Sequence, residues 1–365
     1  MPIHLFDGSG QWYRGNVHSH TTNSDGLFGL NELAKWYARH EYDFLFVTDH
    51  NLVTDVSGHP SREILVLPGA EIGVSWQETF PAEVLALGIQ RMTSQMASPQ
   101  RVIDEVLEQG GVPFLSHPSL SGVSSAAISR LKGLVGIEIF NSPNHWNGRR
   151  GDSTAQWDEL LAGGHRLWGV ASDDRHSGVR PELTFAPLGR QPFRDQAEAW
   201  IMVWARTRTS AEILEAIRQG RFYSTTGPRI EEIAVEDGEI RVKTTPVRSV
   251  WFASSPWLGV RRVVPAGECL TEARAPLSAL ATPGKVAEMT DRFLDRGYWQ
   301  RPRVVGCYVR IELWDGEDGR AWSNPIDLSR EGEPPRQCPD DGSRLRGRPA
   351  EVGCPRLDPH ISNLF

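Results

Sequence analysis

Histidine is distributed very unevenly along this chain of 365 residues. Ten of its eleven His lie at or before position 176, and the stretch from 177 to 359 contains none. Several follow a short apolar run directly, as in Asp43-Phe-Leu-Phe-Val-Thr48, which is followed by Asp49 and His50. Apolar runs of this length are typical of strands buried on both faces. The first half of the chain is therefore expected to form a buried sheet with imidazoles at its strand ends.

Strands and helices are expected to alternate through residues 1–225. Strands are expected at Gly15–His20, Asp43–Thr48, Glu63–Pro68, Glu83–Leu87, Val112–Ser116, Val135–Phe140, Leu167–Ala171 and Ala199–Ala205. Helices are expected at Leu30–Arg39, from Ser98 to before Gly110, at Ser125–Lys132, at Thr154–Ala162 and after Thr209. Ser98 and Thr209 are suited to cap their helices. Such alternation predicts a mostly parallel α/β sheet, and seven or eight units favour a (β/α) barrel over an open sheet.

The pattern changes near Thr225. Short alternating segments follow at Ile230–Val235, Ile240–Thr244, Val250–Ala253 and Val304–Leu313, with turn residues such as Asp237-Gly238 between them. They indicate a small all-β domain that resembles a sandwich. Residues 331–365 are rich in Pro, Arg and Gly and lack periodicity. We therefore expect a barrel at 1–225, a C-terminal β domain at 226–330 and an irregular tail at 331–365.

Side chains that can bind metal ions follow most of the expected strands. His18 and His20 are two positions apart, so on a strand both point to the same side. The others are Asp25, His50, Glu71, His117, Asp174 and His176. In a parallel barrel these strand ends face one way, where active sites lie. Imidazoles and carboxylates together suit Zn²⁺, Mn²⁺ or Fe²⁺, and so many ligands exceed the needs of one ion. The sequence thus predicts at least two ions, with Glu71 as a natural bridge.

Each motif has a plainer explanation when taken alone. The His18–His20 pair can be two surface histidines, and Thr48-Asp-His50 can be a turn. His117 precedes a proline and can be a packed loop residue, while Asp174 and His176 can be a helix cap and a surface residue. Their joint placement at strand ends favours the metal site.

Taken together, the motifs resemble those of the PHP family (polymerase and histidinol phosphatase). They are Gly15-Asn-Val-His-Ser-His-Thr-Thr22, Ser24-Asp-Gly26, Val47-Thr-Asp-His-Asn51, Gly69-Ala-Glu-Ile72, Ser116-His-Pro118 and Ser172-Asp-Asp-Arg-His176. Gly220–Pro228 and Ala321–Pro325 are similar to a branch related to carbamate-hydrolase proteins. The resemblance covers residues 10–330. It implies a distorted barrel of seven parallel strands that holds two or three divalent ions and usually cleaves phosphate esters.

The resemblance also implies a distribution of the ligands. One ion would be held by His18, His20, Glu71 and Asp174; Asp25, His50 and His176 would complete the cluster, with His117 on a second or third ion. Asp174 is preferred to its neighbour Asp173 because the family pattern is Asp-x-His, and Asp173 is the fallback. Several relatives carry a His where this chain has Glu83, which either binds an ion or leaves a third ion weak or absent. Asn141 lies where the family often has a polar residue near the site. The other explanation for this residue is that it forms a turn.

An anionic substrate would need cations or donors at the rim of the site. Arg175 and Arg180 flank the last ligand motif, and Arg149 and Arg150 follow the Val135–Phe140 strand. Arginine matches phosphate well, but each of these has the alternative of being a solvent-exposed side chain in an Arg-rich protein. His145 is a candidate proton donor to a leaving group, or simply an exposed loop histidine.

These features predict a metal-dependent hydrolase. The first candidate is a phosphoesterase that uses a metal-bridging hydroxide on a small or nucleotide-like phosphate ester. A carbamate or carboxylic ester hydrolase with the same metal site is the second, because the same nucleophile attacks carbonyl carbon. The third is a non-catalytic metal-binding module whose β domain docks a partner, although the complete ligand set argues against it. The chain lacks a Gly-rich phosphate loop and a G-x-S-x-G motif, which disfavours nucleotide-dependent transfer and serine chemistry.

The composition of the chain limits the classes of molecule that it is expected to bind. The chain has 39 Lys and Arg against 46 Asp and Glu, a net charge of −7, which argues against binding duplex nucleic acid. No apolar run approaches the roughly 20 residues of a membrane helix, so no membrane is expected. Its four Cys form no C-x-x-C pair, which fits a reducing cytoplasm, although a bridge between Cys338 and Cys354 stays open. A small-molecule substrate is expected, and the oligomeric state is open.

Overall fold

The computed structural model describes residues 3–6, 8–59, 63–76, 82–148, 150–176, 196–254, 258–282, 285 and 307–328. In these residues the chain is a mixed α/β protein with a large sheet and few helices. None of the described helices combines the length and the apolar character that crossing a membrane requires. The expected tail at 331–365, both cysteines Cys338 and Cys354, and Arg180 lie outside the described residues.

The first half alternates strands and helices. Its elements are β1 (Ile3–His4), β2 (Gln11–Asn16), α1 (Leu30–Arg39), β3 (Phe44–Val47), β4 (Leu65–Val74), β5 (Ala82–Leu87), α2 (Pro99–Glu108), β6 (Val112–Leu115), α3 (Pro118–Ser121), α4 (Ser125–Ile128), β7 (Gly136–Asn141), α5 (Ser142–Gly148), α6 (Thr154–Ala162), β8 (Trp168–Ser172), β9 (Trp200–Ala205), α7 (Ser210–Arg218) and β10 (Phe222–Thr225). Helices α1 and α6 have the predicted bounds. The Ser98 side chain accepts a hydrogen bond from Arg101 N, and the Thr209 side chain accepts one from Glu212 N, so both predicted caps are present.

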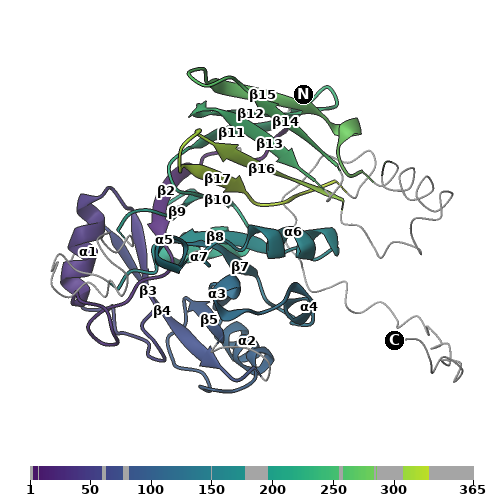
Figure 1. Ribbon diagram of the computed structural model, residues 1–365. Coiled ribbons are helices and arrows are strands. Elements are labelled where there is room, and N and C mark those ends of the chain that lie inside the picture. Colours follow the sequence, from purple (N-terminus) through teal and green to yellow (C-terminus); the bar gives the residue numbers. More distant parts are fainter. Residues whose placement is uncertain are drawn as a thin grey trace, which may run out of the picture.

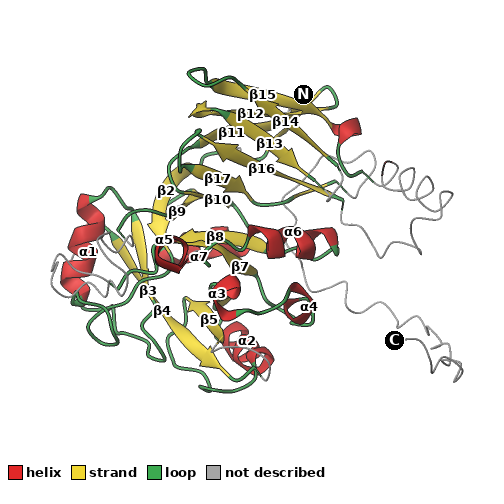
Figure 2. Cartoon of the chain, in the orientation of Figure 1, coloured by secondary structure: helices red, strands yellow, loops and turns green. Residues whose placement is uncertain are grey.

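In its described residues the second half forms mainly strands, together with a short 3₁₀ helix. Its elements are β11 (Ile230–Glu236), β12 (Glu239–Val247), β13 (Ser249–Ala253), β14 (Gly259–Val263), β15 (Leu270–Pro276), η2 (Leu277–Ala279), β16 (Tyr308–Trp314), β17 (Arg320–Ser323) and β18 (Ile326–Asp327). Asp237 and Gly238 join β11 to β12 with positive φ values of 50° and 78°, as a two-residue type I′ hairpin turn requires. Figure 1 shows these strands stacked above the helix-bearing part, and Figure 2 shows that most helices belong to that part.

The described strands form two sheets. The small sheet has the order β1-β11-β12-β15, and the large one has fourteen strands in the order β14-β13-β16-β17-β10-β9-β2-β3-β4-β5-β6-β7-β8, with β18 paired to β16. Strand β10 pairs with both β9 and β17, so the large sheet continues from the first half into the second. Apolar residues of both sheets, such as Ile233, Val242, Phe252 and Ile311, share one core.

A mostly parallel sheet was expected, and two of the expected strands run antiparallel to their neighbours. The β2–β3–β4 and β6–β7–β8 neighbours are parallel, but β5 runs antiparallel to β4 and β6, and β9 runs antiparallel to β2 and β10. Only residues 75–81 separate β4 from β5. A parallel connection needs a crossover of a dozen or more residues, so this short link forces a reversal.

Other expectations differ at the element ends. The strand expected at Gly15–His20 lies earlier, at Gln11–Asn16, and just beyond its end the Asn16 Nδ2 atom donates to the His18 carbonyl oxygen over 2.7 Å. Strand β4 extends to Val74, so Glu71 lies within a strand and not after one. Helix α4 ends four residues before the expected Lys132, and the short helices α3 and α5 had no counterpart in the sequence prediction.

Candidate metal centre

The segments that carry the predicted ligands are held side by side by main-chain contacts beyond the strands. Ser19 forms a parallel bridge with Arg175, and His50 forms one with Glu71. The His20 amide donates to the Arg175 carbonyl oxygen over 2.9 Å, and the Thr48 amide donates to the Ser19 carbonyl oxygen over 2.9 Å. The first and last ligand motifs, more than 150 positions apart in the sequence, therefore lie next to each other.

The turn that carries Asp25 is fixed by the buried carboxylate of Asp49. This carboxylate accepts hydrogen bonds from Thr21 N over 2.7 Å, from Thr21 Oγ1 over 2.7 Å and from Ser24 Oγ over 2.7 Å. Burial alone would raise the pKa of Asp49, but these bonds and one from the Thr54 hydroxyl lower it. Asp49 therefore orders the turn and leaves the Asp25 carboxylate free to face the histidines.

Histidines and carboxylates gather in three overlapping groups, and within each group the ligand atoms lie within 4.8 Å of one another. The inner group is His18, His20, Glu71 and Asp174, all buried. The outer group is His20, Asp25, His50 and His176. The third group is His50, Glu71 and Glu83. His117 adjoins the third group, because its Nε2 atom lies 3.1 Å from Glu71 Oε1 and 3.4 Å from Glu83 Oε2.

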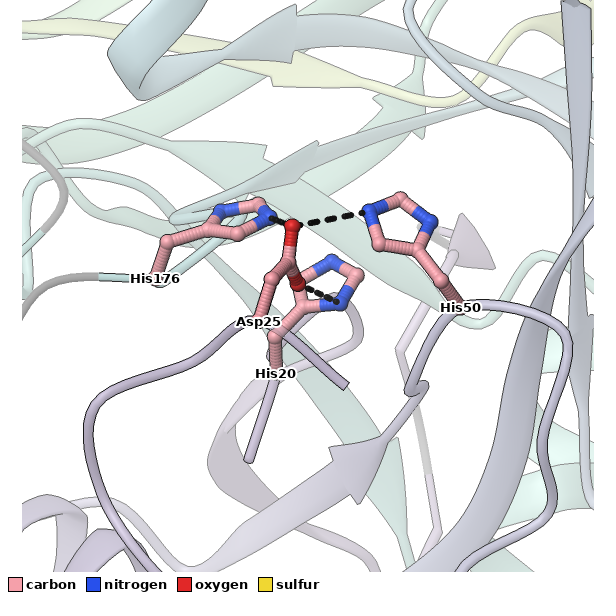
Figure 3. Close-up of side chains that lie close together, drawn as sticks. All are labelled: His20, Asp25, His50 and His176. Carbon is pink, nitrogen blue, oxygen red and sulfur yellow. Dashed lines mark ion pairs between the residues drawn. The ribbon is translucent and has the colours of Figure 1, made fainter. Parts of the chain in front are cut away.

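Figure 3 shows the outer group, in which the Asp25 carboxylate stands among three imidazole rings. Asp25 Oδ2 lies 3.5 Å from His50 Nε2 and 3.5 Å from His176 Nε2, and Oδ1 lies 3.7 Å from His20 Nδ1. The Asp25 side chain is 56% exposed, whereas that of His20 is fully buried. This group therefore lies at the solvent side of the centre.

The distances within the inner group fit the ligands of one metal ion as well as long hydrogen bonds. His18 Nε2 lies 3.1 Å from Glu71 Oε2 and 3.2 Å from Asp174 Oδ1, and His20 Nε2 lies 3.1 Å from Asp174 Oδ1. Charge-assisted N–H···O bonds are shorter, about 2.7–2.9 Å. With metal–ligand distances of about 2.0–2.2 Å, neighbouring ligands are about 3.3 Å apart around a tetrahedral ion and about 3.0 Å apart around an octahedral one. The observed separations match these edges.

Two ring nitrogens of the centre are buried and make no hydrogen bond, namely His18 Nε2 and His20 Nδ1. On the other side of its ring, His18 Nδ1 lies 3.0 Å from Glu138 Oε1. A proton on Nδ1 leaves the lone pair of Nε2 directed at the two carboxylates of the inner group. Such an orphaned nitrogen among carboxylate oxygens is what a site for a divalent cation requires. The residues therefore fit divalent metal ions.

The electrostatics of the groups agree with this. Burial alone would lower the pKa of His18, but Asp174, Glu71 and Glu138 raise it well above the ordinary 6.5. Burial would also lower the pKa of His50, but Glu83 and Glu71 raise it to about 9. Burial would raise the pKa of Glu71, yet it is held well below its ordinary value by His18 and His117. The centre thus attracts positive charge strongly.

Glu138 is a site residue that the sequence analysis missed. It is fully buried and its carboxylate accepts from the His117 amide over 2.8 Å, from Asn141 Nδ2 over 2.9 Å and from the Ser172 hydroxyl, besides its contact with His18. The available signal was a single charged residue in an otherwise apolar buried strand, Gly136–Asn141. Through its contact with Nδ1, Glu138 orients the His18 ring, a candidate ligand of the inner group.

Two candidate ligands have an unusual backbone conformation. His117 has a φ of 23° and Asp174 a φ of 42°, a region that residues other than glycine rarely adopt. Such strain persists only where the surroundings impose it, and it concentrates at functional sites. His117 also precedes Pro118, and the resulting turn directs its ring toward Glu71.

A cavity of about 490 Å³ opens on the centre. It is lined by His50, Glu71, Glu83, His117, Leu120, Ser121, Asn144, Arg150, Asp174 and His176. Arg150 is the one Lys or Arg among these described lining residues, and its side chain is exposed. The cavity therefore combines the ligand groups with one cation that is able to contact an anion.

The structure brings the predicted ligands together with Glu83 and Asn141, but it puts three other candidates elsewhere. The Asp173 carboxylate accepts from the amides of Glu198 over 2.8 Å and Ala199 over 3.0 Å, away from the ligand groups. The buried Arg175 guanidinium lies 3.7 Å from the Trp36 ring centre, so this arginine does not line the cavity. The His145 ring packs on Phe140 at 4.7 Å between centres. Asn141, in contrast, donates to Asp174 Oδ2 over 3.1 Å.

Solved structures resemble this chain. One is a two-domain protein from Bacteroides vulgatus containing a predicted PHP-like metal-dependent phosphoesterase (16% identity, TM-score 0.44, covering 84% of this chain and 92% of that one). Another is an amidohydrolase from Chromobacterium violaceum with bound sulfate (16% identity, TM-score 0.37, 45% and 88%). A third, from Bifidobacterium adolescentis, is described as a metal-dependent phosphoesterase (17% identity, TM-score 0.37, 50% and 92%).

Its structural neighbours are thus PHP-like metal-dependent phosphoesterases and an amidohydrolase. No family model matches the sequence, and no curated protein matches it.

Proposed function

We propose that this protein is a metal-dependent hydrolase that cleaves small phosphate esters. The observation that supports it is the sharing of Glu71 between ligand groups. Glu71 Oε2 lies 3.1 Å from His18 Nε2 and 3.2 Å from His50 Nδ1, while Oε1 lies 3.1 Å from His117 Nε2. A carboxylate in this position can bridge two neighbouring cations, which is the arrangement used for phosphoryl transfer to water.

Two or three divalent ions, Zn²⁺, Mn²⁺ or Fe²⁺, would be held by His18, His20, Glu71 and Asp174, by Asp25, His50 and His176, and by Glu83 and His117. When bound, such ions acidify water and stabilise negative charge on phosphoryl oxygens. The donor set of mixed imidazole and carboxylate suits these metals.

The protein's own residues prepare the site for this chemistry. Glu138 holds the His18 ring so that Nε2 faces the inner group, and Asn141 donates to both Glu138 and Asp174. Arg150 is available at the cavity to bind the negative charge of a phosphate ester. Leu120 adds an apolar side chain to the lining of the cavity. Together they favour an anionic substrate with a less polar remainder.

We take β2 to β8 as a distorted seven-stranded barrel, which the bridge between Ser19 and Arg175 would close, and the strands after residue 226 as a sandwich-like domain. The parallel neighbours on either side of the reversed strand β5 and the shared core of the two sheets support this assignment.

The experiment combines metal analysis with a substrate panel. The purified protein is analysed for bound metal and assayed with chromogenic phosphomonoesters, phosphodiesters and carbamates after loading with Zn²⁺, Mn²⁺ or Fe²⁺. His20→Ala removes a ligand of the inner group, and His59→Ala is the matched control, because His59 contacts Asn31 outside the ligand groups.

We expect at least two metal equivalents and hydrolysis of phosphates, lost in His20→Ala and retained in His59→Ala. Turnover of carbamates without turnover of phosphates would replace the proposal by an ester or carbamate hydrolase. Stoichiometric metal with no turnover on the panel would leave a metal-binding module, and a protein without bound metal would end the proposal.

A further inference from the structure

One wall of the cavity is formed by helix α5 and the residues that flank it, between β7 and α6. We call the described residues of segment 141–152 the cavity wall; it carries Asn144 and Arg150. The Asn141 amide donates to the Gly151 carbonyl oxygen over 2.9 Å, and the Arg150 amide donates to the Asn144 carbonyl oxygen over 2.9 Å. A Cβ atom at Gly151 would lie 2.1 Å from the Asn141 carbonyl oxygen, so only glycine permits this closure. These two hydrogen bonds hold the end of the wall against its beginning.

The back of the cavity wall is anchored by Asp152. Its Oδ2 atom accepts from Arg320 Nη1 over 2.7 Å, and its Oδ1 atom accepts from the Thr154 amide over 2.9 Å. Arg320 comes from β17, in the second half of the chain. Both side chains are about one-quarter to one-third exposed, at 26% for Arg320 and 31% for Asp152. Their ion pair is thus partly desolvated and bonded in a defined geometry, unlike a mobile surface pair.

Arg320 is itself fixed by a line of alternating charges, which we call the charge ladder. Arg320 Nη2 donates to Glu312 Oε1 over 2.8 Å, and Arg310 Nη1 donates to Glu312 Oε2 over 2.8 Å. Arg310 then binds both carboxylate oxygens of Asp158, each over 2.7 Å, and its side chain is 1% exposed. The charge ladder ends at Asp158 on helix α6, so the position of Arg320 is fixed through Glu312 and Arg310 by a regular helix.

A line of aromatic rings connects the same two parts of the chain. The Arg320 guanidinium lies 4.8 Å from the Trp322 ring centre, and the Trp322 ring lies 5.7 Å from that of Phe140. Phe140 in turn packs on His145 of the cavity wall at 4.7 Å. Strand β17 therefore supports the cavity wall by an ion pair and by packing.

We propose that Arg320 is a positioning residue of the candidate active site. By holding Asp152 it fixes the cavity wall and with it Arg150, so that the second half of the chain tunes the binding of an anion that it does not touch. The inference rests on the proposed function only in taking the cavity as the substrate site. It gives the strands after residue 226 a role in the reaction.

The first test measures amide hydrogen exchange in the full chain. Arg320→Met should raise the exchange rate at the Asn141 and Arg150 amides on the order of tenfold, because local opening no longer breaks the ion pair. Arg320→Lys, which keeps the charge, should restore part of the protection. Arg241→Met is the matched control: Arg241 bonds Glu232 and Glu236 in a similar network on β12, away from the wall.

The second test measures binding of inorganic phosphate to the metal-loaded protein. Arg320→Met should weaken it about fivefold with unchanged metal content, and the double variant with Arg150→Met should bind no more weakly than Arg150→Met alone. Unchanged exchange in Arg320→Met, or additive losses in the double variant, would overturn the inference. If the wild type binds no phosphate, the proposed function fails, and the exchange result still decides whether Arg320 positions the wall.

Discussion

The substitution Glu138→Gln tests how the inner group is prepared for a cation, because it keeps the shape of the side chain and removes its charge. The Glu138 carboxylate accepts four hydrogen bonds. Oε1 accepts from His18 Nδ1 over 3.0 Å and from the Ser172 hydroxyl, and Oε2 accepts from the His117 amide over 2.8 Å and from Asn141 Nδ2 over 2.9 Å. A glutamine has one acceptor oxygen and one NH₂ group, so it cannot satisfy both pairs of donors.

The two orientations of the new amide differ in cost. If the NH₂ group points toward the His117 amide, two N–H donors face each other and the buried His117 N–H loses its acceptor. Losing that acceptor destabilises the fold by about 1–3 kcal/mol. With its NH₂ toward His18, the conflict is relieved when the ring proton moves from Nδ1 to Nε2. The second orientation is therefore preferred. It puts a proton on the nitrogen that faces Glu71 and Asp174, and this nitrogen can no longer bind a cation.

We expect Glu138→Gln to weaken binding of the first metal ion about 10- to 100-fold, the usual effect of losing a carboxylate behind a metal-binding histidine. Calorimetric titration of the metal-free protein with Zn²⁺ and with Mn²⁺ measures it, and circular dichroism verifies that the variant is folded. Glu105→Gln is the control, because its carboxylate bonds Ser94 and Arg101 outside the ligand groups. A folded Glu138→Gln variant with the affinity of the wild type would refute the reasoning about the His18 proton.

Three further outcomes are expected. Because the pKa of His50 is about 9, metal binding must displace its proton at neutral pH, so metal affinity should rise from pH 6.5 to 9 and calorimetry should detect proton release. Over the same range the metal-free protein loses the stabilisation that protonated His50 provides, so its melting temperature should fall. A melting temperature that does not change with pH would contradict this. Asp173→Asn should lower the free energy of unfolding by about 1–3 kcal/mol without changing metal stoichiometry, and a lost equivalent would identify Asp173 as a ligand after all. Gly15→Ala would put a Cβ atom 2.0 Å from the Phe44 ring, and urea unfolding should show a loss of about 1–3 kcal/mol, which an unchanged midpoint would exclude.

Local signals predicted the elements that local interactions determine. Helix α2 begins at the predicted Ser98 cap and Pro99, because the cap bond and the fixed φ of proline act within a few residues. Strand direction is different. The apolar run of β5 is the same for either direction, and only the short link from β4 reverses it. Periodicity cannot report this, since it describes faces and not partners.

The candidate ligands were found because most of them follow an apolar run and belong to residue types that bind metals. Glu138 was missed because it lies inside such a run, where its partners come from β8 and from the segment after β6. Arg175 was expected at the rim because it adjoins two ligands. Asp174 and His176 face the centre, whereas the Arg175 guanidinium between them lies 3.7 Å from the Trp36 ring centre. A residue that adjoins candidate ligands in the sequence therefore need not lie near them in the structure.

Burial and charge together explain why this centre is built from histidine. Glu71, Glu138 and Asp174 are at most 6% exposed, and among the described residues none of them pairs with Lys or Arg. Buried carboxylates are costly without positive charge nearby. In the metal-free chain protons supply it, which is why the pKa values of His18 and His117 are raised by these carboxylates against the effect of burial. Lysine or arginine would compensate the charge equally well but would not release a proton near neutral pH. Imidazole can exchange its proton for a metal ion, so the same arrangement is stable in both states.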